Sequence, residues 1–187
     1  MKRSILLLFC SIMFSSCAIQ GLTNDYNGLS ENQKETIVPL KSFDETTDLD
    51  KIYKINGYQL QEELKKYPKA MVYVFKNGCT SEYCKPLYFY ENFANQNNYK
   101  LFLVMNGYAN LEISTVEASK SPLFSIDNDY YKKKYRTTYT RFFQNDMLGR
   151  DLKSKEDEYL GQLFFFENGK LASIERDLPI NPSSVYK

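Results

Sequence analysis

Short apolar runs alternate along the chain with longer stretches in which apolar and polar residues are mixed. Residues 70–75 and 101–105 are uninterrupted apolar runs with the length of buried strands, and an Asn-Gly pair closely follows each of them. Continuous apolar runs of this kind are typical of parallel strands that are covered on both faces. Further short strands are predicted at 122–126, 163–166 and 171–174.

Between these strands, apolar residues recur three or four positions apart, which is the spacing of one helix face. Asn56-Gly57 opens the first of these stretches. The predicted helices are a surface helix within 53–67 that ends before Pro68, a helix that has Pro86 in its first turn, and a helix that is capped by Asp127 or Asn128 and ends near Asn145. Residues 111–118 are expected to form a short helix or an irregular crossover.

The last two predicted strands are joined by Glu167-Asn168-Gly169-Lys170, a sequence typical of a hairpin turn. The order of elements is therefore helix, strand, helix, strand, crossover, helix and hairpin. This order predicts an α/β layer fold with parallel strands in its first half and antiparallel strands at its end.

The N-terminus has the features of an export signal. Lys2 and Arg3 precede an apolar run at 5–14 and two small residues, and Cys17 follows. This run is about half of the roughly 20 residues that a membrane-spanning helix needs, so we do not expect it to remain as an anchor. Phe14-Ser15-Ser16-Cys17 resembles the lipobox of bacterial lipoproteins, which implies cleavage before Cys17 and a lipid on that cysteine. Secretion with cleavage near Ser16 or Ala18 is the alternative.

Residues 18–50 contain few apolar positions and show no period. We therefore predict a signal peptide at 1–16, a lipidated cysteine with a flexible tether at 17–50, a folded domain at 51–180 and a tail at 181–187. Two or more acyl chains on Cys17 would hold the protein on a membrane.

Charge and composition narrow the possible functions. The 24 basic residues, less Lys2 and Arg3 of the signal, leave 22 against 23 acidic ones, so no basic excess indicates nucleic-acid binding. The chain holds no histidine, which excludes Cys-His and Ser-His-Asp catalysis and most zinc enzymes. No metal and no cofactor are expected.

Cys79 and Cys84 are the candidate reactive residues. If the chain is a lipoprotein, Cys10 leaves with the signal and Cys17 carries lipid, so only these two remain as thiols, and an exported pair is expected to form a disulfide. They lie between a predicted strand and the helix at Pro86, where unpaired N–H groups and the helix dipole favour a thiolate. Lys85 adds a positive charge that would stabilise the thiolate, and Glu82 partly opposes it.

Several functions are compatible with this pair. Reversible thiol-disulfide exchange is one, and a structural disulfide is another, although closing a loop of about six residues stabilises a fold by only about 2 kcal/mol. A third makes Cys84 a peroxidatic thiol, because Ser81 lies three residues before it. A fourth is binding of Cu(I) by the thiolates, with help from Met105 or Met147.

Two segments resemble elements of the thioredoxin-like superfamily, in particular its membrane-tethered bacterial thiol-disulfide proteins and their peroxiredoxin-like relatives. VYVFKNGCTSEYCKP, residues 72–86, is similar to the strand, cysteine loop and helix start of the family, and FFFENGKLA, residues 164–172, is similar to its closing hairpin. The resemblance spans roughly 53–177. It implies a three-layer sandwich around a mixed sheet, with Cys79 as the attacking thiol and Cys84 as the resolving one.

The same resemblance implies a function and a location. The protein would be a lipoprotein of the bacterial cell envelope, anchored through Cys17 and facing the periplasm or the cell exterior. Its partners would be envelope proteins that contain cysteines.

Three positions depart from the family pattern. Four residues separate the cysteines instead of two, Asn77-Gly78 stands where the family has a Trp, and Gly161 aligns with the cis-proline that helps to dock substrate. These departures support an alternative, a non-catalytic thioredoxin-like lipoprotein that binds a partner or has a structural role and contains a structural Cys79–Cys84 disulfide.

The cluster YYKKKYRTTYTR at 130–141 could form a basic anion-binding face. Because the flanking sequence restores neutrality, we instead expect a helix with one solvated side. Asn77-Gly78 and Asn168-Gly169 are interpreted as turn formers.

Overall fold

The computed structural model describes residues 21–79, 81, 84–117, 120–156 and 161–179. The predicted signal peptide, Cys17 and the predicted tail at 181–187 lie outside the described residues. Within the described part of the chain, no helix is both long and apolar enough to cross a membrane.

Seven strands form one sheet, in the order β1-β2-β5-β4-β3-β6-β7. The pairings from β1 to β3 across this order are parallel, whereas β6 is antiparallel to β3 and β7 is antiparallel to β6. The strands are β1 (Ile37–Pro39), β2 (Ile52–Ile55), β3 (Lys69–Phe75), β4 (Lys100–Met105), β5 (Leu123–Ile126), β6 (Leu163–Glu167) and β7 (Lys170–Glu175). The five strands predicted from the sequence are confirmed, as is the closing hairpin.

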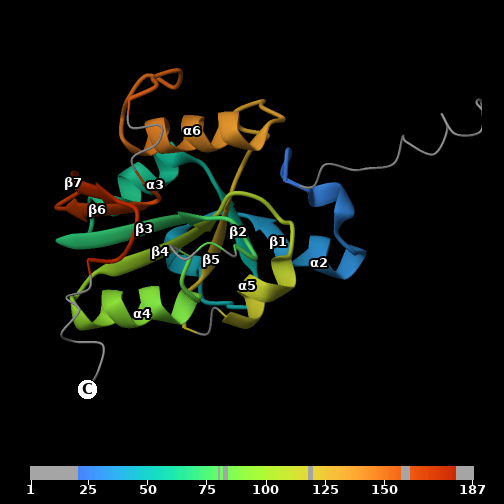
Figure 1. Cartoon of the computed structure of the whole chain (residues 1–187), viewed down its shortest axis with the longest axis horizontal. Coiled ribbons are helices and arrows are strands. Elements are labelled where there is room, and N and C mark those ends of the chain that lie inside the picture. The colour runs from blue at the N-terminus through green and yellow to red at the C-terminus, as the bar shows by residue number, and fades with distance from the viewer. Residues whose placement is uncertain (1–20, 80, 82–83, 118–119, 157–160, 180–187) are drawn as a thin grey trace, which may run out of the picture.

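Helices cover both faces of the sheet, so the predicted α/β three-layer sandwich is confirmed. Figure 1 shows α3 (Gly57–Leu64) and α6 (Arg136–Met147) on one face, with α4 (Leu87–Gln96) and α5 (Leu111–Glu117) on the other. The short helices η1 (Tyr26–Gly28), α2 (Glu31–Thr36) and η2 (Phe43–Glu45) belong to the N-terminal part of the chain. The predicted crossover at 111–118 is thus a short helix as far as Glu117.

Two cores result, one on each face of the sheet. Because side chains alternate along a strand, Val72 and Val74 of β3 pack on the α3 and α6 side, whereas Met71 and Tyr73 pack on the α4 and α5 side. β3 and β4 are buried along almost their whole length. The loop that follows β3 is therefore fixed to a rigid central strand.

The expected flexible tether is wrong for residues 21–50. β1 pairs with β2 at the edge of the sheet, the Leu40 N–H donates to the Lys54 carbonyl at 3.0 Å, and Leu40 is buried. The Phe43 ring lies 5.8 Å from Phe102 and 5.6 Å from Phe124. A few apolar side chains are enough to join this segment to the core although its composition is polar, so the folded domain begins well before residue 51.

Two other element boundaries differ from the predictions. The last long helix begins at Arg136 instead of Asp127 or Asn128, because Lys132 adopts a φ of 52°, which a right-handed helix cannot contain. Within 53–67 the helix begins at Gly57, with Asn56 as its N-cap, and ends at Leu64. The strand β2, which directly precedes this helix, is not predicted from the sequence.

Candidate disulfide site

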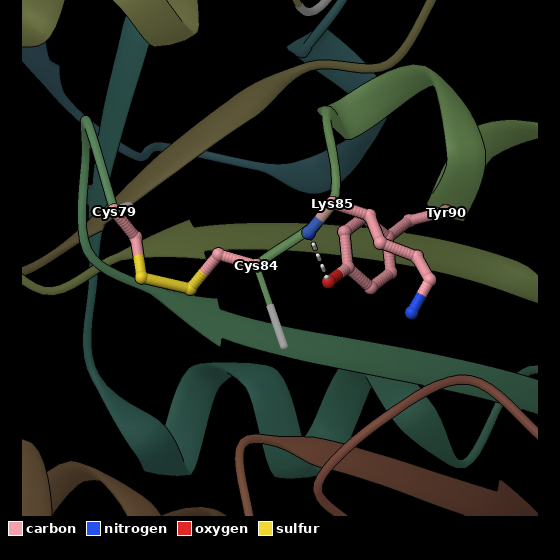
Figure 2. The surroundings of a disulfide bond; sticks show 4 residues. All are labelled: Cys79, Cys84, Lys85 and Tyr90. Carbon is pink, nitrogen blue, oxygen red and sulfur yellow. Dashed lines mark hydrogen bonds between the residues drawn. A yellow bond between two sulfur atoms is a disulfide. The ribbon is translucent and has the colours of Figure 1, made fainter. Parts of the chain in front are cut away.

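The two cysteines lie on the loop between β3 and α4, at the carboxyl edge of the central strand. Cys79 and Cys84 form a disulfide, with their Cα atoms 5.9 Å apart (Figure 2). The Cys84 N–H donates to the Ser81 carbonyl at 2.9 Å inside the ring. Both cysteines are half-buried, so the sulfurs are neither enclosed in the core nor fully exposed.

Asn77 holds this loop to the rest of the fold. Its side chain is 1% exposed, its Nδ2 donates to the Gly107 carbonyl at 2.7 Å, and its Oδ1 accepts a hydrogen bond from Ser114 Oγ at 2.7 Å. Gly78 follows with a φ of 60°, a backbone conformation that glycine adopts without strain. Two other segments, the β4–α5 loop and α5, therefore anchor the loop two residues before Cys79.

The structure does not bring Lys85 to the sulfurs. Its ammonium pairs with the carboxylate of Asp177, which lies just after β7, and the side chain extends away from the disulfide (Figure 2). Asp177, 92 residues further along the chain, is thus the partner of Lys85 in the oxidised state. Stabilisation of a thiolate by Lys85 stays a prediction, because the disulfide contains no thiolate.

The N-terminus of α4 is also less positive than the sequence predicts. Pro86 is its N-cap residue, and the first helical N–H, that of Leu87, donates to Glu117 Oε2 at 3.3 Å. A carboxylate at this position neutralises part of the helix dipole that would otherwise favour a thiolate. Cys84 lies two residues before the cap.

Two stacked tyrosines pack next to the loop. Tyr90 of α4 is fully buried, and its hydroxyl accepts a hydrogen bond from the Lys85 N–H at 3.4 Å (Figure 2). Its ring stacks on Tyr73 of β3, with centroids 4.0 Å apart. Burial raises the pKa of Tyr73, and its hydrogen bond with Tyr90 raises it further. Tyr73 therefore remains a neutral phenol.

The disulfide lines two cavities. The smaller, of about 140 Å³, also includes Ser114 and Glu117 of α5. The larger is a groove of about 760 Å³ that extends from the disulfide to α6 and includes Gly161 and Gln162. Residues of α5, of α6 and of the segments beside β6 and β7 therefore line the cavities next to the disulfide.

Gly161 lies two residues before β6 and lines the same groove as Cys79 and Cys84. Its equivalence to the cis-proline of the thioredoxin-like superfamily stays a prediction. A Cβ atom here would lie 2.0 Å from the Glu175 carbonyl oxygen, so the close approach of β7 excludes every other residue type. Gln162 pairs with its neighbours on both sides, because its carbonyl accepts from Val74 and its N–H donates to Glu175.

The remaining candidate residues are dispersed. Met105 is buried on the α4 and α5 face and Met147 on the α3 and α6 face, so they cannot act together. No group of three or more Cys, Asp or Glu side chains in the described part of the chain could hold a metal ion. Ser81 is exposed, and its carbonyl accepts a hydrogen bond from the Cys84 N–H.

The sequence analysis missed several residues that shape the site. Asn77 offered one signal, a polar residue at the end of a buried strand, but was interpreted only as a turn former. Ser114, Glu117 and Asp177 gave none, because their roles depend on contacts between distant segments.

A comparison of the chain with family models, with curated proteins and with solved structures finds no match.

Proposed function

We propose that this protein is an envelope-anchored, thioredoxin-like lipoprotein that exchanges thiols and disulfides with cysteines of extracytoplasmic proteins. The observation that best supports this is the placement of the Cys79–Cys84 bond. It is half-exposed, and it lines a groove large enough for a segment of another chain.

The anchoring of the loop also supports reversible chemistry. Asn77 ties the chain to Gly107 and Ser114 without help from the sulfurs. Breaking the S–S bond therefore leaves the start of the loop in place. A disulfide that can open without releasing its loop is suited to repeated oxidation and reduction.

In the reducing direction, the Cys79 thiolate attacks one sulfur of a substrate disulfide. A mixed disulfide forms and the other substrate sulfur leaves as a thiolate, which takes up a proton. Cys84 then loses its proton and attacks Cys79 Sγ, which restores the protein disulfide and releases the second substrate thiolate. Two electrons pass from the protein dithiol to the substrate disulfide, and the reverse sequence oxidises a substrate dithiol.

A second candidate is a non-catalytic lipoprotein that binds a partner or has a structural role, with Cys79–Cys84 as a structural bond. Two contacts favour it. Asp177 engages the Lys85 ammonium, and Glu117 accepts the first N–H of α4, so the two groups expected to stabilise a thiolate both have carboxylate partners.

Trapping of mixed disulfides tests the exchange function. Cys84→Ser in the full chain removes the resolving thiol, so a substrate attacked by Cys79 stays attached and is seen as a larger, thiol-sensitive species on non-reducing gels. Cys79→Ser is the matched control, since it removes the same disulfide but also the attacking thiol. Trapping by Cys84→Ser alone supports exchange. An absence of adducts from both variants contradicts exchange and favours the structural function.

Membrane anchoring through Cys17 is a separate part of the proposal. Cys17→Ser is expected to move the protein from the membrane fraction to the soluble fraction and to abolish incorporation of labelled fatty acid. Cys10→Ser serves as the control, because that cysteine is expected to leave with the signal. Fatty-acid labelling that persists in Cys17→Ser would contradict the anchor.

A further inference from the structure

Four basic side chains line the groove beside the disulfide. Lys76, Arg136, Arg141 and Arg176 all line it, and no Asp or Glu is among the described residues of its lining. These side chains come from three separate parts of the chain, the end of β3, α6 and the segment after β7. The overall composition is nearly neutral, so these four residues form a local concentration of basic side chains.

One face of α6 forms a wall of the groove. Arg136, Thr140 and Gln144 are four residues apart and therefore align along the helix, with Thr137 and Arg141 beside them. The opposite face, including Tyr139 and Phe142, is buried in the core. Arg136 to Gln144 spans about 12 Å of helix. At about 3.3 Å per residue, this wall matches roughly four residues of an extended peptide.

Two polar atoms of groove-lining residues lack partners among the described residues. The Thr140 hydroxyl and Asn106 Oδ1 are both buried, and neither has a hydrogen bond there. Buried polar atoms are normally paired, because leaving them unpaired is unfavourable. A hydroxyl that can donate or accept and an amide oxygen that accepts suit a peptide backbone, which offers both C=O and N–H groups.

We infer that this groove binds an extended, acidic peptide segment that flanks the reacting cysteine of the substrate. The inference rests on the proposed exchange function, because it takes the groove next to the sulfurs as the substrate site. Arginine guanidinium groups bind carboxylates through paired hydrogen bonds, and a cluster of like charges beside the sulfurs also attracts an acidic partner from solution. The basic residues at 136 and 141 thus form an anion-binding face, not only the solvated face that the sequence favours.

A binding experiment tests this without any redox step. The oxidised full chain, with Cys10 and Cys17 replaced by Ser, is titrated into fluorescent cysteine-free hexapeptides that carry four Asp, four Lys or four Ser residues. Anisotropy should show binding of the Asp peptide at least about tenfold tighter than of the other two, and the difference should shrink as salt is raised. Equal binding of the three peptides, or no binding of the Asp peptide, would overturn the inference.

Variants locate the binding in the groove. Lys76→Gln and Arg136→Gln, singly and together, should reduce the preference for the Asp peptide. Lys134→Gln is the matched control, because it removes the same charge from an exposed residue outside the groove and should preserve the preference. If Lys134→Gln has the same effect as the groove variants, the attraction is general and the inference fails.

The exchange step is measured separately, so that the two proposals can fail independently. The reduced protein is mixed with the same peptides, each carrying one cysteine as a mixed disulfide with a chromophoric thiol. Exchange that is equal for all three contradicts the acidic preference and leaves the exchange function intact. Tight binding of the Asp peptide without any exchange supports the groove as a binding site and contradicts the redox function.

Discussion

An Asn-Gly turn lies near each end of β3, one in the chain directly after the strand and one in the hairpin that packs beside its start. The asparagine has a different role in each turn. Asn168-Gly169 forms the tip of the hairpin beside the start of β3, with both residues at positive φ, 50° and 74°. Its asparagine is exposed and uses its backbone N–H to reach the Pro68 carbonyl. Asn77-Gly78 follows the end of β3, and its asparagine is buried and bonded through its side chain to two other segments.

The comparison separates local from tertiary causes. Asn168 is favoured because asparagine tolerates a left-handed backbone, which is a local property. Asn77 is needed because Gly107 and Ser114 present a buried acceptor and donor to it, which no local pattern reveals. The turn with tertiary contacts is the one that leads to the disulfide.

Asparagine substitution should give the largest contrast between the two turns. Asn77→Ala leaves the Gly107 carbonyl and the Ser114 hydroxyl unpaired in buried surroundings, so we expect a loss of about 3 kcal/mol in the free energy of unfolding. Asn168→Ala places a less tolerant residue at positive φ and should lose about 1 kcal/mol. Urea unfolding of the oxidised proteins at pH 7 measures both. Equal losses would remove the distinction between the two turns.

The disulfide is a second difference between the turns, with a smaller expected effect. Removing it by Cys79→Ser with Cys84→Ser should lower the free energy of unfolding by about 2 kcal/mol, since the closed loop has only about six residues. The fold should persist, because Asn77 still anchors the loop. Amide hydrogen exchange checks this: protection should fall around the disulfide loop and remain unchanged at the hairpin. A global loss of protection would show that the disulfide, and not Asn77, holds this end of the domain.

Glycine substitution should destabilise the Asn168-Gly169 turn more than the Asn77-Gly78 turn, which is the reverse of the order expected for asparagine substitution. A Cβ at Gly169 would lie 2.9 Å from Lys65 Cα, a backbone atom that cannot move aside easily, so Gly169→Ala should destabilise by about 2 kcal/mol. A Cβ at Gly78 would lie 2.8 Å from Asn110 Nδ2, which can rotate away, and 3.0 Å from Asn110 Cβ, which needs only a small shift of an exposed loop residue. Gly78→Ala should therefore lose only about 1 kcal/mol. The thermal midpoints of the two variants rank them, and a lower midpoint for Gly78→Ala contradicts this account.

The two ends of β3 should respond differently to alkaline pH, because a tyrosine with a raised pKa lies near each end. Burial raises the pKa of Tyr108, next to Gly107, to about 12, and burial with the Glu63 hydrogen bond raises that of Tyr67, next to Pro68, to about 12. A raised folded-state pKa stabilises the fold fully below pH 10, and this contribution is lost as the pH rises from 10 to 12.

Between pH 10 and 12, each fully buried tyrosine lowers the free energy of unfolding by at most about 1.4 kcal/mol per pH unit. Tyr108→Phe should flatten the pH dependence more than Tyr67→Phe, because Tyr67 is partly exposed and solvent screens its environment. Urea midpoints between pH 9 and 12 give the two slopes. A larger change in Tyr67→Phe would contradict the assignment of the more deeply buried hydroxyl to Tyr108.

The sequence predicts the central architecture because its signals are local. Continuous apolar runs identify β3 and β4, and the Glu167–Lys170 turn identifies the hairpin. β1 and β2 escape detection because they are short and their burial comes from neighbouring strands. The start of α6 is misplaced because a single left-handed residue, Lys132, interrupts an otherwise helical composition.

The residues of the site also fall into two groups, those that local sequence predicts and those that contacts between distant segments bring to the site. The positions of the cysteine pair after β3 and of Gly161 before the hairpin can be predicted from residue order, since each lies next to a recognisable strand or hairpin. The charges cannot be assigned this way. Asp177 engages Lys85, Glu117 caps α4, and two arginines of α6 enter the groove through the packing of segments that are far apart in the chain.

The reduction potential of the Cys79–Cys84 pair tests the proposed exchange function most directly. The full chain, with Cys10 and Cys17 replaced by Ser, is equilibrated in graded thiol buffers, and its free thiols are counted by mass after alkylation. A potential between about −270 and −120 mV, the range of known exchange catalysts, is the predicted result. A potential below about −300 mV is typical of a structural disulfide and would contradict the exchange function.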